Sequence, residues 1–221
     1  MDRRSTLAAV LGRTGAQRKN KTSENAFPPS IHSGLAPYTG PWGREQAAHL
    51  LRRATFGPTP AQIDAARQNG LNATLAQLLA DQPMPDQPVN PNNTTDPNVP
   101  IGETWINAPY VAGVNVAGYR NQSLRAWTFG LIVNEGVSIR EKMTLFWHNH
   151  FAINDIADAR FLYRYITLLR ASALGNFRQL VKDITIDPAM LRFLNGNQNT
   201  RNAPNENYAR ELLELFTIGK G

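Results

Sequence analysis

Helix-start signals recur along this chain, and no stretch alternates apolar and polar residues as a half-buried strand would. "TPAQ" at 59–62 supplies a capping threonine, a proline at the first helical position and a glutamine at the third. "SIRE" at 138–141 has the spacing of a capping box, and "DPAM" at 187–190 places an aspartate cap before a proline. The apolar residues that follow these starts recur at spacings of three and four, which is the period of a helix. The sequence therefore predicts an all-α fold.

These signals define an irregular multi-helix domain. Seven helices are predicted, and two further ones follow them, with Gly196 and Gly219 as the residues that end these last two. The predicted ranges are 44–54, 60–68, 71–80, 121–134, 139–151, 158–172 and 177–184, followed by 188–194 and 204–217.

The segment 83–119 interrupts this pattern with proline, asparagine, glutamine and glycine, as in "QPMPDQPVNPNNTTDPNVP". Such a composition neither starts a helix nor fills a core. A structureless segment of this length is usually an insertion, a lid or a disordered loop, and Trp105 and Tyr110 are the residues with which its end would dock on the body. We therefore expect residues 1–40 to form a basic leader and residues 41–221 to form one helical domain that carries this long loop.

The net charge of +6 is concentrated before residue 22, where six of the 23 basic residues are opposed only by Asp2 among the 17 acidic ones. The rest of the chain is nearly neutral and has no basic stripe, so we expect no binding to nucleic acid. The chain has no cysteine, which excludes disulfides, thiolate zinc sites and cysteine nucleophiles. A divalent metal ion here would need His, Asp, Glu or Asn ligands.

Arg3 and Arg4 precede a short apolar run at 7–11, an arrangement that resembles a twin-arginine export signal. That run is shorter than the ~7–15 residues of a signal core, and basic residues resume at Arg13 with no A-x-A site after them. Two locations therefore stay open: export through this leader, or a cytoplasmic protein that keeps a basic leader. No later run approaches the ~18 apolar residues of a membrane span, so we expect no transmembrane segment.

Four separated stretches carry a resemblance to a known family. They are "AAHLLRRATFGPTPAQID", "REKMTLFWHNHFA", "ALGNFRQLVKDITIDPAML" and "APNENYARELLELFTIGKG". Together they resemble the bacterial domain-of-unknown-function 1800 family (DUF1800), from about Arg44 to the C-terminus, with the proline-rich loop unmatched. The resemblance implies a helical fold, frequent export and a partner protein of a sulfatase-like family, but no reaction. Family members normally continue for a few hundred residues after "ELFTIGKG", so it also implies that this chain is the N-terminal portion of a longer domain.

His148 and His150 lie one residue apart in "FWHNHFA" and are half of the four histidines. If 139–151 is one regular helix, successive residues turn by about 100°. The two imidazoles then point apart and cannot hold one metal ion, because the helical metal pattern uses residues four apart. They form a metal-ligand pair only if the helix ends at Trp147. Two interpretations stand: structural histidines bonded to backbone or carboxylates, or catalytic residues and metal ligands.

The segment "NENYAREL" is the second candidate for a site. Its apolar stripe predicts one buried helix face, and the other face carries Glu206, Arg210 and Glu211. One interpretation is a solvated surface of ion pairs four residues apart. The other is a carboxylate ledge that faces the histidines, beside the asparagine-rich run 195–207, whose amide oxygens suit a sugar or metal site.

Two functions follow from these candidates. The first is a hydrolase-like or metal-assisted enzyme that uses a His/Glu/Asn polar cleft, with the two histidines at its centre and the later helix completing it. The second is a non-catalytic helical accessory or scaffold module that acts with a partner protein. Under either function we expect His148 or His150 to hydrogen-bond a polar residue of 205–214, because an unmet polar group among aromatic side chains costs ~1–3 kcal/mol.

Overall fold

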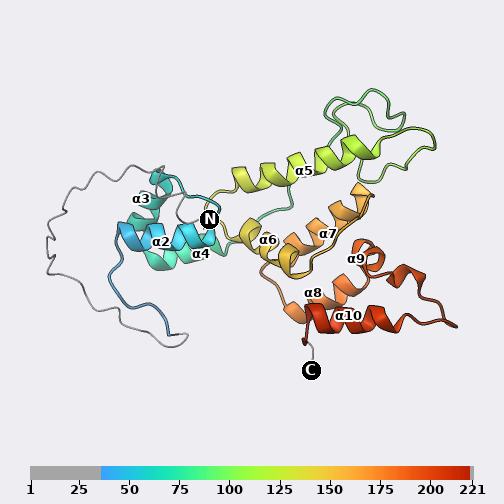
Figure 1. Cartoon of the computed structure of the whole chain (residues 1–221). Coiled ribbons are helices and arrows are strands. Elements are labelled where there is room, and N and C mark those ends of the chain that lie inside the picture. The colour runs from blue at the N-terminus through green and yellow to red at the C-terminus, as the bar shows by residue number, and fades with distance from the viewer. Residues whose placement is uncertain (1–35, 220–221) are drawn as a thin grey trace, which may run out of the picture. The chain divides into compact units, whose positions relative to one another are not determined.

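The computed structural model describes residues 36–219, and all regular secondary structure in that range is helical (Figure 1). The predicted all-α fold is confirmed. Extended pairing within the described range is limited to isolated bridges, Val89 with Thr104 and Thr200 with Ala203. The elements are α2 (Arg44–Ala54), α3 (Pro60–Asn69), α4 (Leu71–Leu78), α5 (Ala117–Asn134), α6 (Arg140–His150), α7 (Ala159–Ala171), α8 (Phe177–Thr185), α9 (Pro188–Phe193), the 3₁₀ turn η1 (Gly196–Gln198) and α10 (Glu206–Phe216).

Two expectations concern membranes and export. None of the helices within residues 36–219 has the length and apolar character needed to cross a bilayer. The basic leader with its Arg3–Arg4 pair lies outside the described residues, so the structure leaves the export prediction as it stood.

Helices α2, α3 and α4 share a small core that is built mainly from alanine and leucine. At the start of α3 the Thr59 hydroxyl accepts the Gln62 amide proton at 3.2 Å, and Gln62 Oε1 accepts that of Thr59 at 2.7 Å. This reciprocal pair confirms the predicted capping box. Gly70, with φ of 83°, lets the chain turn directly from α3 into α4.

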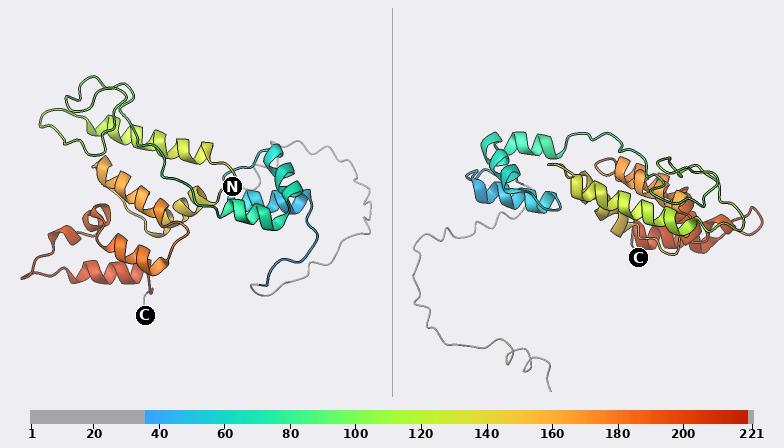
Figure 2. Two further views of the ribbon diagram at one scale, coloured as in Figure 1. Left: turned by 180° about the vertical axis from the view of Figure 1, so that it is seen from behind. Right: turned by 90° about the horizontal axis from the view of Figure 1, so that it is seen from above.

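The proline-rich segment before α5 contributes to a core that it shares with α5 and α7, although its composition predicts none. Val99 and Trp105 are buried, and the indole Nε1 of Trp105 donates to Ser123 Oγ of α5 at 3.0 Å. The segment folds back along the first turns of α5 (Figures 1 and 2). The predicted docking through Trp105 is therefore confirmed, and α5 begins at Ala117, earlier than the predicted residue 121. A few anchoring side chains, rather than the average composition, determine how this segment folds.

A buried ion pair holds this segment to α5. The Asp96 carboxylate lies 2.7 Å from Arg120 Nη2, and both side chains are fully buried. Burial by itself raises the pKa of Asp96, but hydrogen bonds from Tyr119 and Arg120 outweigh it and place that pKa below its ordinary value. Arg120 also donates to the carbonyl of Ala108 at 2.9 Å. The guanidinium of Arg120 therefore holds the segment at both Asp96 and Ala108.

The largest core joins α7, α8, α9 and α10 to the end of α6. Asp187 caps α9 as predicted, because its carboxylate accepts the amide protons of Ala189 at 2.8 Å and Met190 at 3.2 Å. The helix does not end on Gly196: the left-handed residue is Asn195, with φ of 57°. The fully buried side chains of this core are Phe151, Tyr165, Leu169, Leu180, Ile184 and Met190.

The start of α6 differs from the predicted capping box. Ser138 Oγ accepts the amide proton of Arg140 at 3.1 Å, and Glu135 Oε1 accepts that of Glu141 at 2.8 Å. The carboxylate of Glu141 does not reach back to Ser138, because it pairs with Arg170 of α7 at 2.6 Å. A tertiary ion pair therefore replaces the local bond that the "SIRE" spacing suggests.

Candidate functional site

Helix α6 continues through the histidine pair and ends at His150. The condition for a His148–His150 chelate, an end at Trp147, is therefore not met, and the two imidazoles leave the helix about 160° apart at 3.6 residues per turn. Within residues 36–219 no three His, Cys, Asp or Glu side chains are grouped so that they could hold a metal ion. The two histidines have to be considered one by one.

His150 is tied to another helix. Its Nε2 lies 2.7 Å from the carbonyl oxygen of Phe216, the last residue of α10. A carbonyl only accepts, so Nε2 carries the proton. His150 therefore contacts the helix that contains "NENYAREL", but the expected hydrogen bond to a polar residue of 205–214 is not made: the partner is the backbone carbonyl of Phe216. The last carbonyls of a helix have no partner within it, which makes them available to His150.

His148 is half-buried and makes an edge-to-face contact with the ring of Tyr165, with centroids 5.9 Å apart. Neither ring nitrogen hydrogen-bonds to another of the residues between 36 and 219. Burial lowers the pKa of His148 below its ordinary value of 6.5, so the imidazole is neutral at pH 7. A neutral imidazole with a free ring nitrogen is a proton acceptor.

His148 lines a pocket of about 760 Å³ between α5, α7 and the chain that connects α6 to α7. Arg125 and Thr128 of α5 form one wall, and Asn154 and Asp155 of the connection form another. Thr128 Oγ1 donates to the Leu124 carbonyl at 2.9 Å, which uses its proton within α5. The pocket therefore offers one imidazole, one guanidinium, one carboxylate and the two amides of Asn121 and Asn154 to a ligand.

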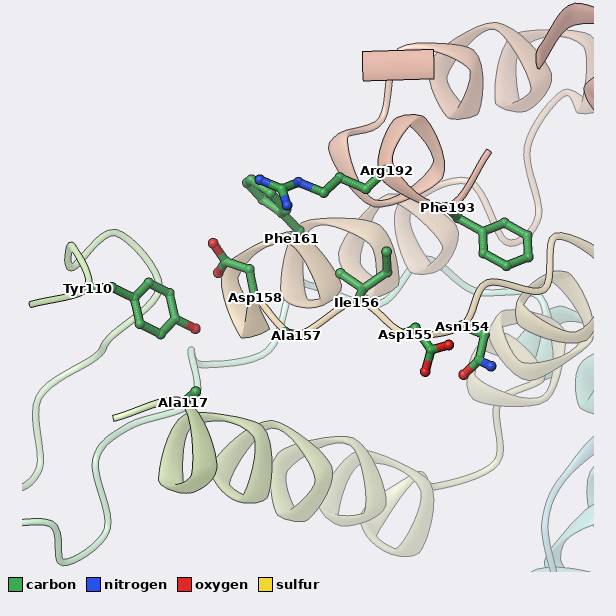
Figure 3. A pocket seen from close by; sticks show the side chains of 10 residues that line it. All are labelled: Tyr110, Ala117, Asn154, Asp155, Ile156, Ala157, Asp158, Phe161, Arg192 and Phe193. Carbon is green, nitrogen blue, oxygen red and sulfur yellow. The ribbon is translucent and has the colours of Figure 1, made fainter. Parts of the chain in front are cut away.

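The connection between α6 and α7 also borders a second pocket, of about 610 Å³. Asn154 and Asp155 lie next to each other at one end of it, and Tyr110 and Asp158 lie at the other (Figure 3). Asp155 has φ of 55°, a left-handed conformation that costs a residue other than glycine ~1–2 kcal/mol. Backbone strain of this kind is often found at functional sites, where it orients a side chain. Asp155 lines both pockets.

The candidates on α10 lie elsewhere. Tyr208, Leu212 and Phe216 form the buried stripe of this helix, as predicted. Glu206 and Arg210 are exposed on its other side, and neither they nor Glu211 line the two pockets around Asp155. The hydrogen bonds on this side of the helix are local: Asn207 Nδ2 donates to Glu211 Oε1 at 2.6 Å, and Arg210 donates to Asn207.

The sequence indicated His148 but not the groups around it. Asn154 and Asp155 occur in "INDIAD", a stretch that carries no chemical motif. Arg125 belongs to α5, where it looks like any exposed helix cation. These residues lie near His148 because α5 packs against α7. A local sequence pattern does not predict this packing.

Comparisons with known proteins agree with the motifs. The model of the family described as "Protein of unknown function (DUF1800)" matches residues 49–221. No curated protein and no solved structure gives a significant match. Because the matched range covers most of the chain and includes α3 to α10, this chain belongs to the DUF1800 family.

Proposed function

We propose that this chain carries a hydrolase-like active site in which His148 is the general base. The observation that supports the proposal is the environment of the His148 imidazole. It is half-buried, makes no hydrogen bond to the described residues and lines a pocket. Burial lowers its pKa, which favours the neutral form. General bases work best when they are unprotonated at the working pH and within reach of the proton to be removed.

The proposed step activates water. A free ring nitrogen of His148 takes a proton from a water molecule while the water oxygen attacks the electrophilic carbon or phosphorus of an ester. The imidazolium then returns this proton to the leaving oxygen, so the base is regenerated in each cycle. A positioned base of this kind contributes about 10²–10⁴-fold to a rate.

Negative charge that develops on the substrate needs donors on the opposite wall. Arg125 supplies a guanidinium and Asn154 an amide to the same pocket. Donors that are fixed before the reaction stabilise such charge more than mobile water does. Asp155, in its left-handed conformation, follows Asn154 in the chain and lines the same pocket.

The test is a panel of chromogenic carboxylic and phosphoric esters, assayed with the wild-type chain and with His148→Gln. We expect kcat/KM to rise with pH through the pKa of His148, which burial places below 6.5, so the rise should come at a lower pH than for an ordinary histidine. His148→Gln should lower kcat by about 10²-fold or more. His49→Gln is the matched control, because His49 is exposed on α2 and lines neither pocket.

Equal activity of wild type and a folded His148→Gln variant would end the general-base assignment. The proposed step uses no metal ion. A parallel assay with added EDTA or Zn²⁺ therefore distinguishes it from metal-assisted hydrolysis. Full loss of activity in EDTA, with recovery on Zn²⁺, would replace this proposal by the metal-assisted one.

The accessory-module function is kept as the alternative because of one observation. Phe129 and Val133, four residues apart on α5, are 67% and 78% exposed. Large apolar side chains that share an exposed face are typical of a docking surface. A co-expressed sulfatase-like partner that co-purifies with the wild type but not with Phe129→Ser/Val133→Ser would favour this function. Unchanged co-purification would count against that surface.

A further inference from the structure

A third pocket, of about 710 Å³, lies away from His148 and is not used by the proposed reaction. It is formed by the chain after α4, the last turns of α5, the start of α6 and the end of α7. It has no lining residue in common with the pocket of His148. Any ligand it binds is therefore held by a separate set of side chains.

Five charged side chains line this pocket: Asp86, Glu135, Glu141, Arg140 and Arg170. Glu141 pairs with Arg170 at 2.6 Å, and both side chains are more than nine-tenths buried. Arg140 is equally buried, and its Nη2 lies 3.1 Å from the exposed Asp81 carboxylate. Glu135 is half-buried beside them. The two arginines balance the two glutamates, and the exposed Asp86 adds one negative charge, so the wall disfavours an anionic ligand.

Two polar atoms in this wall are buried without a partner among the described residues. One is Nε of Arg140, which can only donate, and the other is Oε2 of Glu135. The remaining guanidinium nitrogens of Arg140 and the Oε1 atom of Glu135 are bonded. Burial raises the pKa of Glu135, and the negative charge of Glu141 raises it further. A buried donor and a buried acceptor left unpaired each cost ~1–3 kcal/mol unless a bound molecule completes them.

The rest of the wall combines apolar and amide surfaces. Trp127 is half-buried, and its Nε1 donates to the Asp86 carbonyl at 2.6 Å, which fixes the indole. Pro83 and Pro85 continue the apolar surface, and Asn134 adds an amide. A fixed aromatic face, with polar groups that both donate and accept, matches a ring that is apolar on its faces and hydroxylated at its edge.

We propose that this pocket binds a neutral saccharide, with Glu135 Oε2 and Arg140 Nε as its polar anchors. A sugar hydroxyl both donates and accepts hydrogen bonds. It can therefore donate to the carboxylate oxygen and accept from the guanidinium nitrogen. Trp127 supplies the face on which the ring packs. The pocket would hold this saccharide whether or not His148 acts as a base.

The test measures binding of maltose, cellobiose and chitobiose to the whole chain by saturation-transfer NMR and calorimetry, with spermidine and citrate as cationic and anionic probes. At least one of the three saccharides should bind at millimolar concentration. Glu135→Gln keeps the acceptor for the Glu141 amide but removes the carboxylate, and we expect it to weaken binding about tenfold.

A second variant blocks the pocket without touching its charges. Gly130 lines the pocket, and a Cβ placed there meets no atom within 4 Å, so Gly130→Leu fills the space while α5 stays folded. Gly118→Leu is the matched control, on the same helix, equally open and outside the pocket. Gly130→Leu should abolish binding, whereas Gly118→Leu and His148→Gln should leave it unchanged.

Each of the following results would overturn the proposal. They are binding of spermidine or citrate alone, binding of no saccharide, and saccharide binding that persists in Gly130→Leu. Loss of binding in His148→Gln would assign the saccharide to the pocket of His148 instead. Ester hydrolysis is measured separately, so failure of this site and failure of the proposed reaction are distinguishable.

Discussion

His150 Nε2 donates to the carbonyl oxygen of Phe216 at 2.7 Å, so the last residue of α6 is bonded to the last residue of α10. His148, two residues earlier, has no such bond to the described part of the chain and borders a pocket. Two histidines of one short motif thus have different surroundings. His150 joins two helices, whereas His148 lines a pocket.

Replacing His150 by alanine should lower the free energy of unfolding by ~1–3 kcal/mol, because the half-buried carbonyl of Phe216 loses its donor. Urea denaturation followed by circular dichroism measures this change. His150→Gln retains an amide donor and should recover part of the loss. An alanine variant as stable as the wild type would show that the α6–α10 bond does not contribute.

Replacing Asp96 by asparagine should cost ~3–5 kcal/mol at pH 7, because it leaves the guanidinium of Arg120 charged and fully buried. The double variant Asp96→Asn/Arg120→Met removes both charges and should lose much less than the single one. The same denaturation experiment compares the two. Equal losses in the single and double variants would mean that the charge pairing is not the cause.

The Asp96 carboxylate also makes stability depend on pH. Its pKa is lowered in the fold, so its contribution is present above the ordinary value of 3.8 and is lost as pH falls through the folded pKa. The wild type should therefore lose stability below pH 3.8 more steeply than the double variant does. Parallel pH profiles of the two proteins would contradict this account.

Gly196 should not tolerate alanine. A Cβ at this position would lie 2.7 Å from the Tyr208 ring and 2.8 Å from Leu191, inside the largest core. We expect Gly196→Ala to destabilise by ~1–3 kcal/mol through overpacking. Gly118→Ala, in open space on α5, is the control and should be neutral or slightly stabilising. Thermal melting of both variants decides the point, and a neutral Gly196→Ala would refute the close contact.

Trp105→Ala should destabilise the chain by ~3–5 kcal/mol, because the indole is fully buried and bonded to Ser123. Limited proteolysis should then cut the segment 83–116 first. A variant that melts and resists protease like the wild type would show that this segment is a removable insertion. The matched control is Trp42→Ala in the separate α2–α4 core, which should leave that segment protected.

Local signals in the sequence predicted the helices well, because caps and apolar periodicity act within a few residues. Thr59 and Asp187 cap as expected. The "SIRE" box was wrong because Glu141 finds Arg170 on another helix. The fold of the proline-rich segment likewise depends on the ion pair between Asp96 and Arg120, which are 24 residues apart in the sequence.

The candidate site could be predicted only in part, for the same reason. The rarity and aromatic setting of His148 single it out in the sequence. Its neighbours Arg125 and Asn154 carry no motif and become neighbours only when α5 packs beside α7. Glu206 and Arg210 form a regular charged pattern, yet they lie on the exposed side of α10. A regular spacing of charged residues indicates an exposed helix surface. It does not indicate whether that surface forms part of a functional site.

The most direct test of the account is an NMR titration of the His148 imidazole in the folded chain, with its signals assigned by comparison with His148→Gln. The account predicts a pKa below the ordinary value of 6.5, because burial disfavours the imidazolium and no carboxylate among the described residues pairs with it. A ligand that enters the pocket should then shift the same signals. A pKa at or above 6.5 would contradict the neutral, unpaired base on which the proposed reaction depends.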